Sequence, residues 1–567
     1  MTCFHRKYVL LLLTAVILFG IFIGLTVYSV SKWKSKQAIV RTKLGVIRGL
    51  NAIDGNYSMY LGVPYASVDK KNPFGPSTPV PKFKDVLNAY DDTAICPQLD
   101  EFNPTISGTL DCLHLNIYVP HSASIDNRLP VVAYIHGGRN EVGSAGRNYY
   151  GPSFLMKKNI ILITLNYRLG PYGFMCLGTE EVPGNQGLKD ELLALEWINE
   201  NIEAFGGDPQ KVTLAGSSSS GIHVLLHLAR TNQPLFQQAY FRSGFRPYPM
   251  IMNEPDVTVP LRIADDLGLK TNDTNEALRY LTLKDPLAVI LSAIRLNIHF
   301  GPCVEKVFNV DRFVTKHIRD ITEVPSLKNL AVLITEANNE YLYKYGPENF
   351  DDANKDIFKK VLYSIFDFDE ERLDSMEQKV RQFYIGGEQI SNKVKQKIID
   401  FASDIVQRYP TRRNIRILIE NGVKKLYYGI FSYYGERNLI RQLYRVNDSF
   451  KGATHNDDIG YLFDGAILED KHSKSDHVII DRLSELFGNF VKYGDPNPKP
   501  SKLLPLEWKP VTNDTLFYYN IDTNMSNGTE PLQKRMAFWD MFYKLNGKYE
   551  RLTEGKWMSE MNVRIKN

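Results

Sequence analysis

The sequence predicts an α/β protein with a large central, mostly parallel sheet flanked by helices. Several near-continuous apolar runs lie along the chain, and runs without alternation are typical of strands that are buried on both faces. A helix with one apolar face lies between the second and third runs, which gives a strand, helix, strand unit. The runs span residues 131–135, 160–165, 212–215, 330–335 and 426–434.

Shorter patterns predict the other elements. Apolar residues recur every three or four positions between 188 and 205, which predicts the helix of that unit. Residues 38–49 alternate like a short hairpin, and we place the start of the globular domain there. A charged, helix-rich stretch at 351–413 interrupts the strand series, and we interpret it as an insertion integral to the domain. Because no long unstructured linker divides the chain, we expect one domain over residues 38–567.

Bulk composition excludes one class of function. Hydrophobic residues make up 43% and charged residues 23% of the chain, which is ordinary for a globular protein with a large core. The formal net charge is only +4, and part of this excess is the cluster Lys32, Lys34 and Lys36. The sequence therefore predicts no basic face for nucleic acid.

An N-terminal apolar segment is a candidate membrane span. Residues 8–30 carry no charged side chain, and at about 1.5 Å per helical residue they are long enough to cross a bilayer. A cleavable signal peptide has a shorter apolar stretch of about 7–15 residues, so we expect an uncleaved signal-anchor, although residues 27–29 offer a cleavage pattern. This predicts a short cytoplasmic tail over 1–7, a transmembrane helix over 8–30 and a juxtamembrane stalk over 31–37.

Two further features indicate that the domain lies in the lumen or outside the cell. Cys96 and Cys112 bracket a loop that suits a disulfide in an oxidising compartment, with two buried thiols as the alternative. Cys176 and Cys303 have no obvious partner, and we expect both to be buried free thiols. Polar stretches also hold Asn-x-Ser/Thr sequons, the acceptors of N-glycans, and these features together predict a type II membrane protein, or a secreted one if the segment is cleaved. The sequons begin at Asn56, Asn272, Asn447, Asn513, Asn524 and Asn527.

A turn of small residues is the first candidate for chemistry. Residues 216–221 read Gly-Ser-Ser-Ser-Ser-Gly, after a buried run and before an apolar helix that starts near Ile222. A nucleophile elbow occupies such a position, and its GxSxG pattern places small residues two positions either side of the serine. Counting from the first glycine gives Ser218 and counting back from the second gives Ser219, so the local sequence leaves both open.

From about residue 39 to about residue 543, the chain resembles the type-B carboxylesterase and cholinesterase family. Several segments match in the family's order, which makes chance implausible. They are LGVPYA at 61–66, DCLHLN at 111–116, IHGG at 135–138, NYRLG at 166–170, PGN at 183–185, FGGDP at 205–209, KGATHNDD at 451–458 and NFVKYGDP at 489–496. The resemblance implies the α/β-hydrolase fold, and the family positions of Cys96 and Cys112 imply that these two cysteines pair.

The resemblance also implies a catalytic triad. An ungapped match over 212–228 places the family serine on Ser218. The family acid lies in a segment like 333–340, which gives Glu340, with Glu336 as the weaker candidate, and the histidine segment gives His455. Serine, acid and histidine then follow in the chain order of α/β-hydrolases.

The loop that binds the oxyanion departs from the family pattern. The family's backbone N–H donors map to Gly138, Arg139 and Ser219, but Arg139 stands where the family has a glycine and Asn140 where it has a phenylalanine. A backbone N–H survives this substitution, whereas the arginine side chain is expected to add bulk and charge beside the acyl pocket. Since the loss of one oxyanion donor costs ~3 kcal/mol, a displaced loop would leave a slow enzyme.

Two further departures lie at the elbow, and one lies in the cysteine loop. Ser217 replaces the family's glutamate, and Ser220 replaces a glycine, where a Cβ costs about 1–3 kcal/mol if it strains the backbone. The loop between Cys96 and Cys112 has no tryptophan, the residue on which cholinesterases stack a quaternary ammonium. The sequence therefore argues against a cholinesterase.

The resemblance implies a carboxylic ester hydrolase that acts through an acyl-enzyme on a small-molecule ester. We expect neither a cofactor nor a metal ion. The alternative is a cholinesterase-like adhesion or ligand-binding protein with a protein partner, because the family includes adhesion members that keep the fold and lose triad residues. A slow binder of lipophilic ligands is a third, weaker hypothesis. The complete triad favours the enzyme.

Overall fold

The computed structural model describes residues 38–100, 105–230, 235–308, 311–320, 325–347, 349–350, 356–468 and 472–553. The predicted tail, transmembrane helix and stalk at 1–37 lie outside the described residues. Within the described ranges, no helix is both long enough and apolar enough to cross a membrane.

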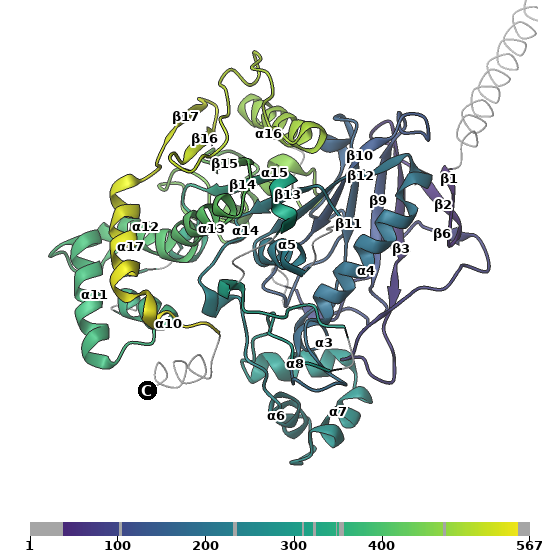
Figure 1. Ribbon diagram of the computed structural model, residues 1–567, viewed down its shortest axis with the longest axis horizontal. Coiled ribbons are helices and arrows are strands. Elements are labelled where there is room, and N and C mark those ends of the chain that lie inside the picture. Colours follow the sequence, from purple (N-terminus) through teal and green to yellow (C-terminus); the bar gives the residue numbers. More distant parts are fainter. Residues whose placement is uncertain are drawn as a thin grey trace, which may run out of the picture.

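One large sheet runs through the molecule (Figure 1). The described residues give it 13 strands. Its path is β1 (Ala38–Thr42), β2 (Gly45–Asn51), β3 (Tyr57–Pro64), β9 (His114–Pro120), β11 (Ile161–Leu165), β10 (Leu129–Ile135), β12 (Gly207–Ser217), β13 (Gln238–Arg242), β14 (Ala331–Ala337), β15 (Lys425–Phe431), β16 (Phe517–Ile521) and β17 (Ser526–Thr529), with β6 (Leu87–Asn88) beside β2. The sheet is mixed, because the predicted parallel pairing holds from β11 to β16, whereas the outer strands pair antiparallel except for the short β6, which is parallel to β2.

The central strands are buried on both faces, as their sequences predict. In β10, Val131 and Ala133 belong to a core that includes helices α4 (Gln186–Asn201) and α5 (Ser219–Arg230). Val132 and Tyr134 of the same strand belong to a second core that includes α16 (Lys474–Tyr493). Because neither face meets water, both sets of side chains are apolar and the sequence shows no alternation.

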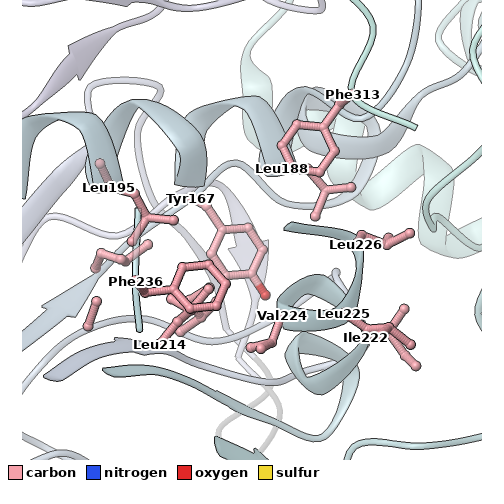
Figure 2. Close-up of a cluster of buried hydrophobic side chains, with 14 of the residues drawn as sticks. Tyr167, Leu188, Leu195, Leu214, Ile222, Val224, Leu225, Leu226, Phe236 and Phe313 are labelled. Atoms are coloured by element: carbon pink, nitrogen blue, oxygen red, sulfur yellow. The ribbon is translucent and has the colours of Figure 1, made fainter. Parts of the chain in front are cut away.

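The first core explains the helical pattern at 188–205. Leu188 and Leu195 of α4 share one cluster with Leu214 of β12 and Val224 of α5 (Figure 2). The α-helix ends at Asn201, and a tighter 3₁₀ turn continues to Phe205. The predicted helix is therefore present, with its last turn tightened.

The described part of the charged stretch, residues 356–413, forms a helical insertion between β14 and β15. Its helices are α10 (Ile357–Ile365), α11 (Glu370–Ile385), α12 (Lys395–Ser403) and α13 (Tyr409–Glu420), and they share a third core with α17 (Gln533–Asn546). Trp539 of α17 is fully buried there, and Arg535 lies 2.6 Å from Asp404. These helices gather at the same end of the molecule (Figure 1).

The remaining elements are short. The helices are α2 (Ser153–Met156), α3 (Gly170–Phe174), α6 (Val259–Asp266), α7 (Thr274–Thr282), α8 (Pro286–Arg295), α9 (Leu342–Tyr345), α14 (Leu439–Leu443) and α15 (Ile459–Leu462). Two small sheets pair β4 (Ala66–Ser67) with β5 (Thr78–Pro79) and β7 (Gln98–Leu99) with β8 (Ile106–Ser107).

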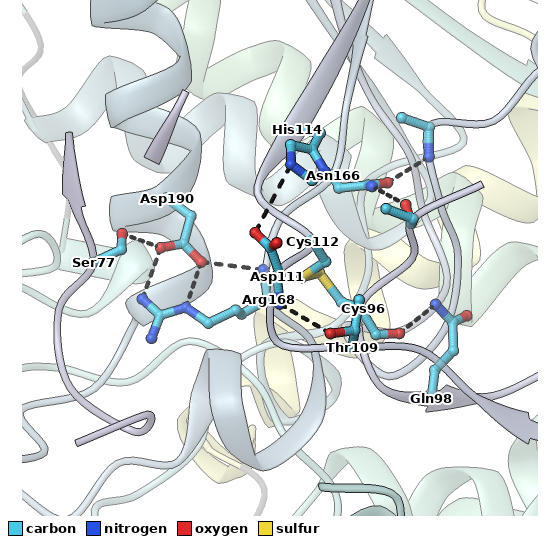
Figure 3. The surroundings of a disulfide bond; sticks show 12 residues. Ser77, Cys96, Gln98, Thr109, Asp111, Cys112, His114, Asn166, Arg168 and Asp190 are labelled. Carbon is cyan, nitrogen blue, oxygen red and sulfur yellow. Dashed lines mark hydrogen bonds and ion pairs between the residues drawn. A yellow bond between two sulfur atoms is a disulfide. The ribbon is translucent and has the colours of Figure 1, made fainter. Parts of the chain in front are cut away.

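Two disulfides cross-link the described chain. The predicted bridge between Cys96 and Cys112 is confirmed, and Figure 3 shows it among the polar residues around it. The prediction for Cys176 and Cys303 was wrong, because these residues form a second bridge. Their separation of 127 residues hides the pairing in the sequence, and folding brings both sulfurs against the turn at Gly184.

Candidate active site

Ser218 occupies a sharp turn between β12 and α5. Its φ of 55° lies in the left-handed region, which places the side chain at the end of the parallel strands. The neighbouring chains approach closely, since a Cβ added at Gly137 would lie 2.9 Å from the Ser218 Cβ. A Cβ added at Gly221 would lie 2.5 Å from the Gly244 Cα. The geometry is that of a nucleophile elbow.

The three residues of the predicted triad lie together. Oγ of Ser218 is 2.9 Å from Nε2 of His455, and Nδ1 of the same ring is 2.6 Å from Oε2 of Glu340. Glu340 is fully buried, and the other two side chains are nearly so. A buried carboxylate at Nδ1 fixes the proton on that nitrogen, which leaves Nε2 free to accept the serine proton.

The loop after β13 also holds Glu340. The Ser243 hydroxyl and the Ala337 N–H both donate to Oε1, each at 2.7 Å. Burial by itself would raise the pKa of Glu340, but His455 and these hydrogen bonds hold the pKa below its usual value. The carboxylate is therefore ionised and oriented before any substrate binds.

The structure distinguishes Glu340 from the alternative acid Glu336, and Ser218 from the alternative serine Ser219. Glu336 lies on β14 and pairs with Arg408 at 3.0 Å and with the Tyr428 hydroxyl, so it is occupied elsewhere. Ser219 is the first residue of α5, and its buried hydroxyl contacts no hydrogen-bond partner among the described residues. Only Ser218 of the two serines is bonded to His455 in the described chain.

The loop at 138–140 is built from three consecutive residues with positive φ. Gly138, Arg139 and Asn140 have φ of 117°, 55° and 64°. Within the described part of the chain, the backbone N–H groups of Gly138, Arg139 and Ser219 donate no hydrogen bond. The Arg139 side chain borders the cavity, but it is 59% exposed and faces the Glu141 carboxylate at 3.9 Å. Its guanidinium is therefore mostly exposed to solvent and lies beside an acidic residue of the same cavity wall.

The substitutions at the elbow are accommodated by hydrogen bonds. The Ser220 backbone has no positive φ, so the Cβ at this position does not cause the backbone strain that a left-handed conformation would cause. Its Oγ accepts the Ser217 N–H at 2.8 Å and lies 2.8 Å from the Ile135 carbonyl. Ser217 Oγ donates to the Asn456 side chain at 2.8 Å, which ties the elbow to the residue after the histidine.

A cavity of about 740 Å³ lies beside the triad serine. Its apolar wall includes Met250, Phe300 and Val361, whereas Arg246 and His223 add polar groups. This volume suits a small organic ligand.

A buried His and Glu network beneath the cavity was missed by the sequence argument. Nδ1 of His223 lies 2.7 Å from Glu191, whose other oxygen is 3.0 Å from Nε2 of His227. Burial opposes the charge of Glu191, but the two histidines lower its pKa below the usual value. The spacing of the two histidines on one helix face was the available signal.

The chain is similar to known proteins in sequence and in fold. The sequence pattern of the carboxylesterase family matches residues 36–539. The chain belongs to this family. This carboxylesterase is 27% identical over 518 residues to a juvenile hormone esterase from Tribolium castaneum, covering 83% of this chain and 86% of the relative. It is 30% identical over 395 residues to a carboxylic ester hydrolase from Bombus ignitus, covering 66% of this chain and 70% of the relative.

A solved structure shows the same fold. The crystal structure of juvenile hormone esterase from Manduca sexta, with OTFP covalently attached, matches this carboxylesterase with a TM-score of 0.77 and 25% identity. The match covers 90% of this chain and 100% of that one. Fold and family together identify a carboxylesterase-type serine hydrolase that acts on carboxylic esters.

Proposed function

We propose that this carboxylesterase cleaves small-molecule esters through Ser218, His455 and Glu340, with an acyl-enzyme intermediate. The supporting observation is the continuous hydrogen-bonded chain from Ser218 Oγ to His455 at 2.9 Å and from His455 to Glu340 at 2.6 Å. Each residue type suits its role, since serine needs a base and the base needs an orienting carboxylate.

Acylation uses all three residues. Ser218 Oγ attacks the ester carbonyl carbon while His455 Nε2 takes the hydroxyl proton, and Glu340 stabilises the resulting imidazolium. The carbonyl oxygen becomes negatively charged, and the N–H groups of Gly138, Arg139 and Ser219 are the proposed donors to it. The carbon–oxygen bond to the alcohol then breaks, and His455 returns its proton to the departing alcohol. The acyl group remains on Ser218.

Deacylation repeats these steps with water. His455 takes a proton from a water molecule, whose oxygen attacks the acyl carbon, and then returns the proton to Ser218 Oγ as that bond breaks. The carboxylic acid leaves, and the enzyme is restored. No cofactor or metal ion takes part in this sequence.

A fluorophosphonate probe tests the proposal directly. We expect the purified protein to be labelled and the Ser218→Ala variant to remain unlabelled, because the probe reacts with an activated serine. Ser219→Ala is the matched control and should still be labelled. If folded wild-type protein takes up no probe, the adhesion or ligand-binding alternative replaces this mechanism.

We also propose that residues 8–30 anchor the enzyme as a type II membrane protein, with residues 1–7 in the cytoplasm and the catalytic domain lumenal or extracellular. Support comes from the uncharged length of the segment and from the sequons. The asparagines of all six sequons are exposed, which is compatible with glycosylation.

Microsomes test this topology. We expect protease-protected protein that loses mass on glycosidase treatment and still contains the N-terminal segment. Mature protein that lacks residues 1–30 would mean that the segment is cleaved and the enzyme secreted. Protein without glycans that protease digests from the cytoplasmic side would contradict both arrangements.

A further inference from the structure

Arg246 is a cation in the wall of the catalytic cavity, and it takes no part in the proposed mechanism. It lines the same cavity as Ser218 and Ser219. The chain reaches this place by close packing, since a Cβ added at Gly244 would lie 2.7 Å from the Gly221 Cα and 3.4 Å from the Ser218 carbonyl oxygen. Arg246 is two residues further along and is held near the reacting serine.

Within the described chain, no carboxylate lies within ion-pair distance of this guanidinium, and its buried Nε has no hydrogen-bond partner. Glu340 is the nearest acid that acts on it, but both oxygens of that carboxylate already accept hydrogen bonds from His455, Ser243 and the Ala337 N–H. Arg246 is half-buried in the cavity wall, and a guanidinium that is partly removed from water without a carboxylate partner favours an anionic ligand beside it.

The immediate neighbours of Arg246 keep it charged. Burial opposes the charge, but Tyr341, Tyr343 and Glu340 hold the pKa of Arg246 above its usual value. Both tyrosines line the cavity, so they flank the guanidinium without supplying a negative charge. The planar fork of arginine matches a carboxylate with two parallel hydrogen bonds.

Among the described residues, the other charged groups of the lining are mainly positive. Arg139, Lys344 and Lys360 also border the cavity, and Glu141 is the one carboxylate of this described lining. Glu141 already faces Arg139 at 3.9 Å and His299 at 3.1 Å. The field inside the cavity is therefore positive, and low-dielectric walls concentrate such a field.

We infer that this carboxylesterase is selective for esters that carry a second, anionic group, in the simplest case a carboxylate, and that Arg246 binds that group. This deepens the proposed function and rests on the same cavity. The apolar part of the wall would contact the carbon skeleton of the substrate, while Arg246 fixes the anionic end. The anion belongs either to the acyl part or to the alcohol part, and the experiment distinguishes them.

Two matched pairs of esters test the inference. For the acyl side, 4-nitrophenyl hydrogen glutarate is compared with its neutral methyl ester. For the alcohol side, 4-acetoxybenzoate is compared with methyl 4-acetoxybenzoate. We expect the wild-type kcat/KM to favour the anionic member of one pair by at least about tenfold, which is ~1.4 kcal/mol, and this preference to shrink at high salt.

Variants distinguish a specific role of Arg246 from a general effect of positive charge on the protein. Arg246→Gln should reduce the ratio of anionic to neutral kcat/KM at least about tenfold, and Arg246→Lys should restore part of it. Lys211→Gln removes a charge from an exposed side chain near the start of β12, at the opposite end of the strand, and should leave the ratio unchanged. Equal kcat/KM within both pairs, or an unchanged ratio in Arg246→Gln, would overturn the inference.

Equilibrium binding to Ser218→Ala keeps this test independent of catalysis. Ser218→Ala should bind the glutarate or benzoate anion, and the double variant with Arg246→Gln should not. This result supports the inference even if the proposed triad proves inactive. Hydrolysis of neutral esters without any anionic preference would sustain the mechanism and reject the anion site.

Discussion

At the scale of residues, some residues of the site lie in recognisable sequence motifs and others lie in no motif. Ser218 and His455 are 237 residues apart, yet both lie in segments that could be matched by pattern. Ser243 and Arg246 lie in no such segment, because each is a single polar residue whose role depends on the strand before it. Sequence patterns could therefore predict the triad but not the groups that orient Glu340 or face the substrate.

Arg139 offers the clearest test of a single substitution. Its φ of 55° is unfavourable for a residue with a Cβ, whereas glycine adopts it freely. Because the side chain is mostly exposed and faces Glu141, we expect Arg139→Gly to raise kcat/KM for a small, activated, neutral ester by no more than about tenfold, or ~1.4 kcal/mol. Steady-state kinetics measure this change, with Arg128→Gly as a matched variant remote from the cavity. A fall in kcat/KM would mean that the arginine itself assists the reaction.

At the scale of elements, the apolar runs without alternation correctly predicted central strands, and the alternating residues 38–49 form the predicted hairpin of β1 and β2. Residues 131–135 and 212–215 form parts of β10 and β12, as expected from their apolar sequences. Strand β13, Gln238–Arg242, was missed because it is short and has polar ends. Arg242 is nevertheless buried, since it pairs with Asp458 at 2.8 Å. A local pattern cannot reveal an ion pair that forms across 216 residues.

The second disulfide gives a prediction for the cavity wall. Cys303 follows Phe300, Gly301 and Pro302, which line the cavity, and its backbone is also held by the Asn185 side chain at 2.8 and 2.9 Å. Replacing both Cys176 and Cys303 by alanine should cost about 2–5 kcal/mol of stability and raise KM more than it lowers kcat, because the wall loses its covalent attachment. Thermal unfolding and steady-state kinetics measure the two effects.

The paired control replaces Cys96 and Cys112, whose bridge spans only 16 residues. On the loop-entropy estimate this bridge is worth ~3 kcal/mol, less than the longer one, and it should affect KM little. Peptide mapping without reduction should recover both bridges from wild-type protein. Free thiols at Cys176 and Cys303 would show that the bridge does not form and would remove the basis of this prediction.

At the scale of the whole molecule, burial moves titratable groups near the site in opposite directions. Burial lowers the pKa of His136, at the start of the oxyanion loop, to about 4. Burial also raises the pKa of Asp457, two residues after His455, to about 7, although Thr454 and Asn438 donate hydrogen bonds to it. As the pH falls, His136 lowers the free energy of unfolding and Asp457 raises it. The two effects therefore offset each other in the pH dependence of the wild-type protein.

A difference measurement isolates His136. Between pH 6.5 and about 4 the unfolded chain binds a proton on this histidine that the folded chain does not, so folding stability falls as the pH is lowered through this window. His136→Gln removes this term, and we expect its stability to change less steeply than that of wild type by up to ~1.4 kcal/mol per pH unit. The variant loses the stacking of His136 on Tyr167, so it should be less stable than wild type near neutral pH and approach it in acid. Denaturant unfolding across the window measures both slopes, with exposed His121→Gln as the control that should follow wild type. Parallel curves for wild type and His136→Gln would show that the pKa of His136 is the same in the folded and unfolded chains, and would contradict the lowering of this pKa by burial.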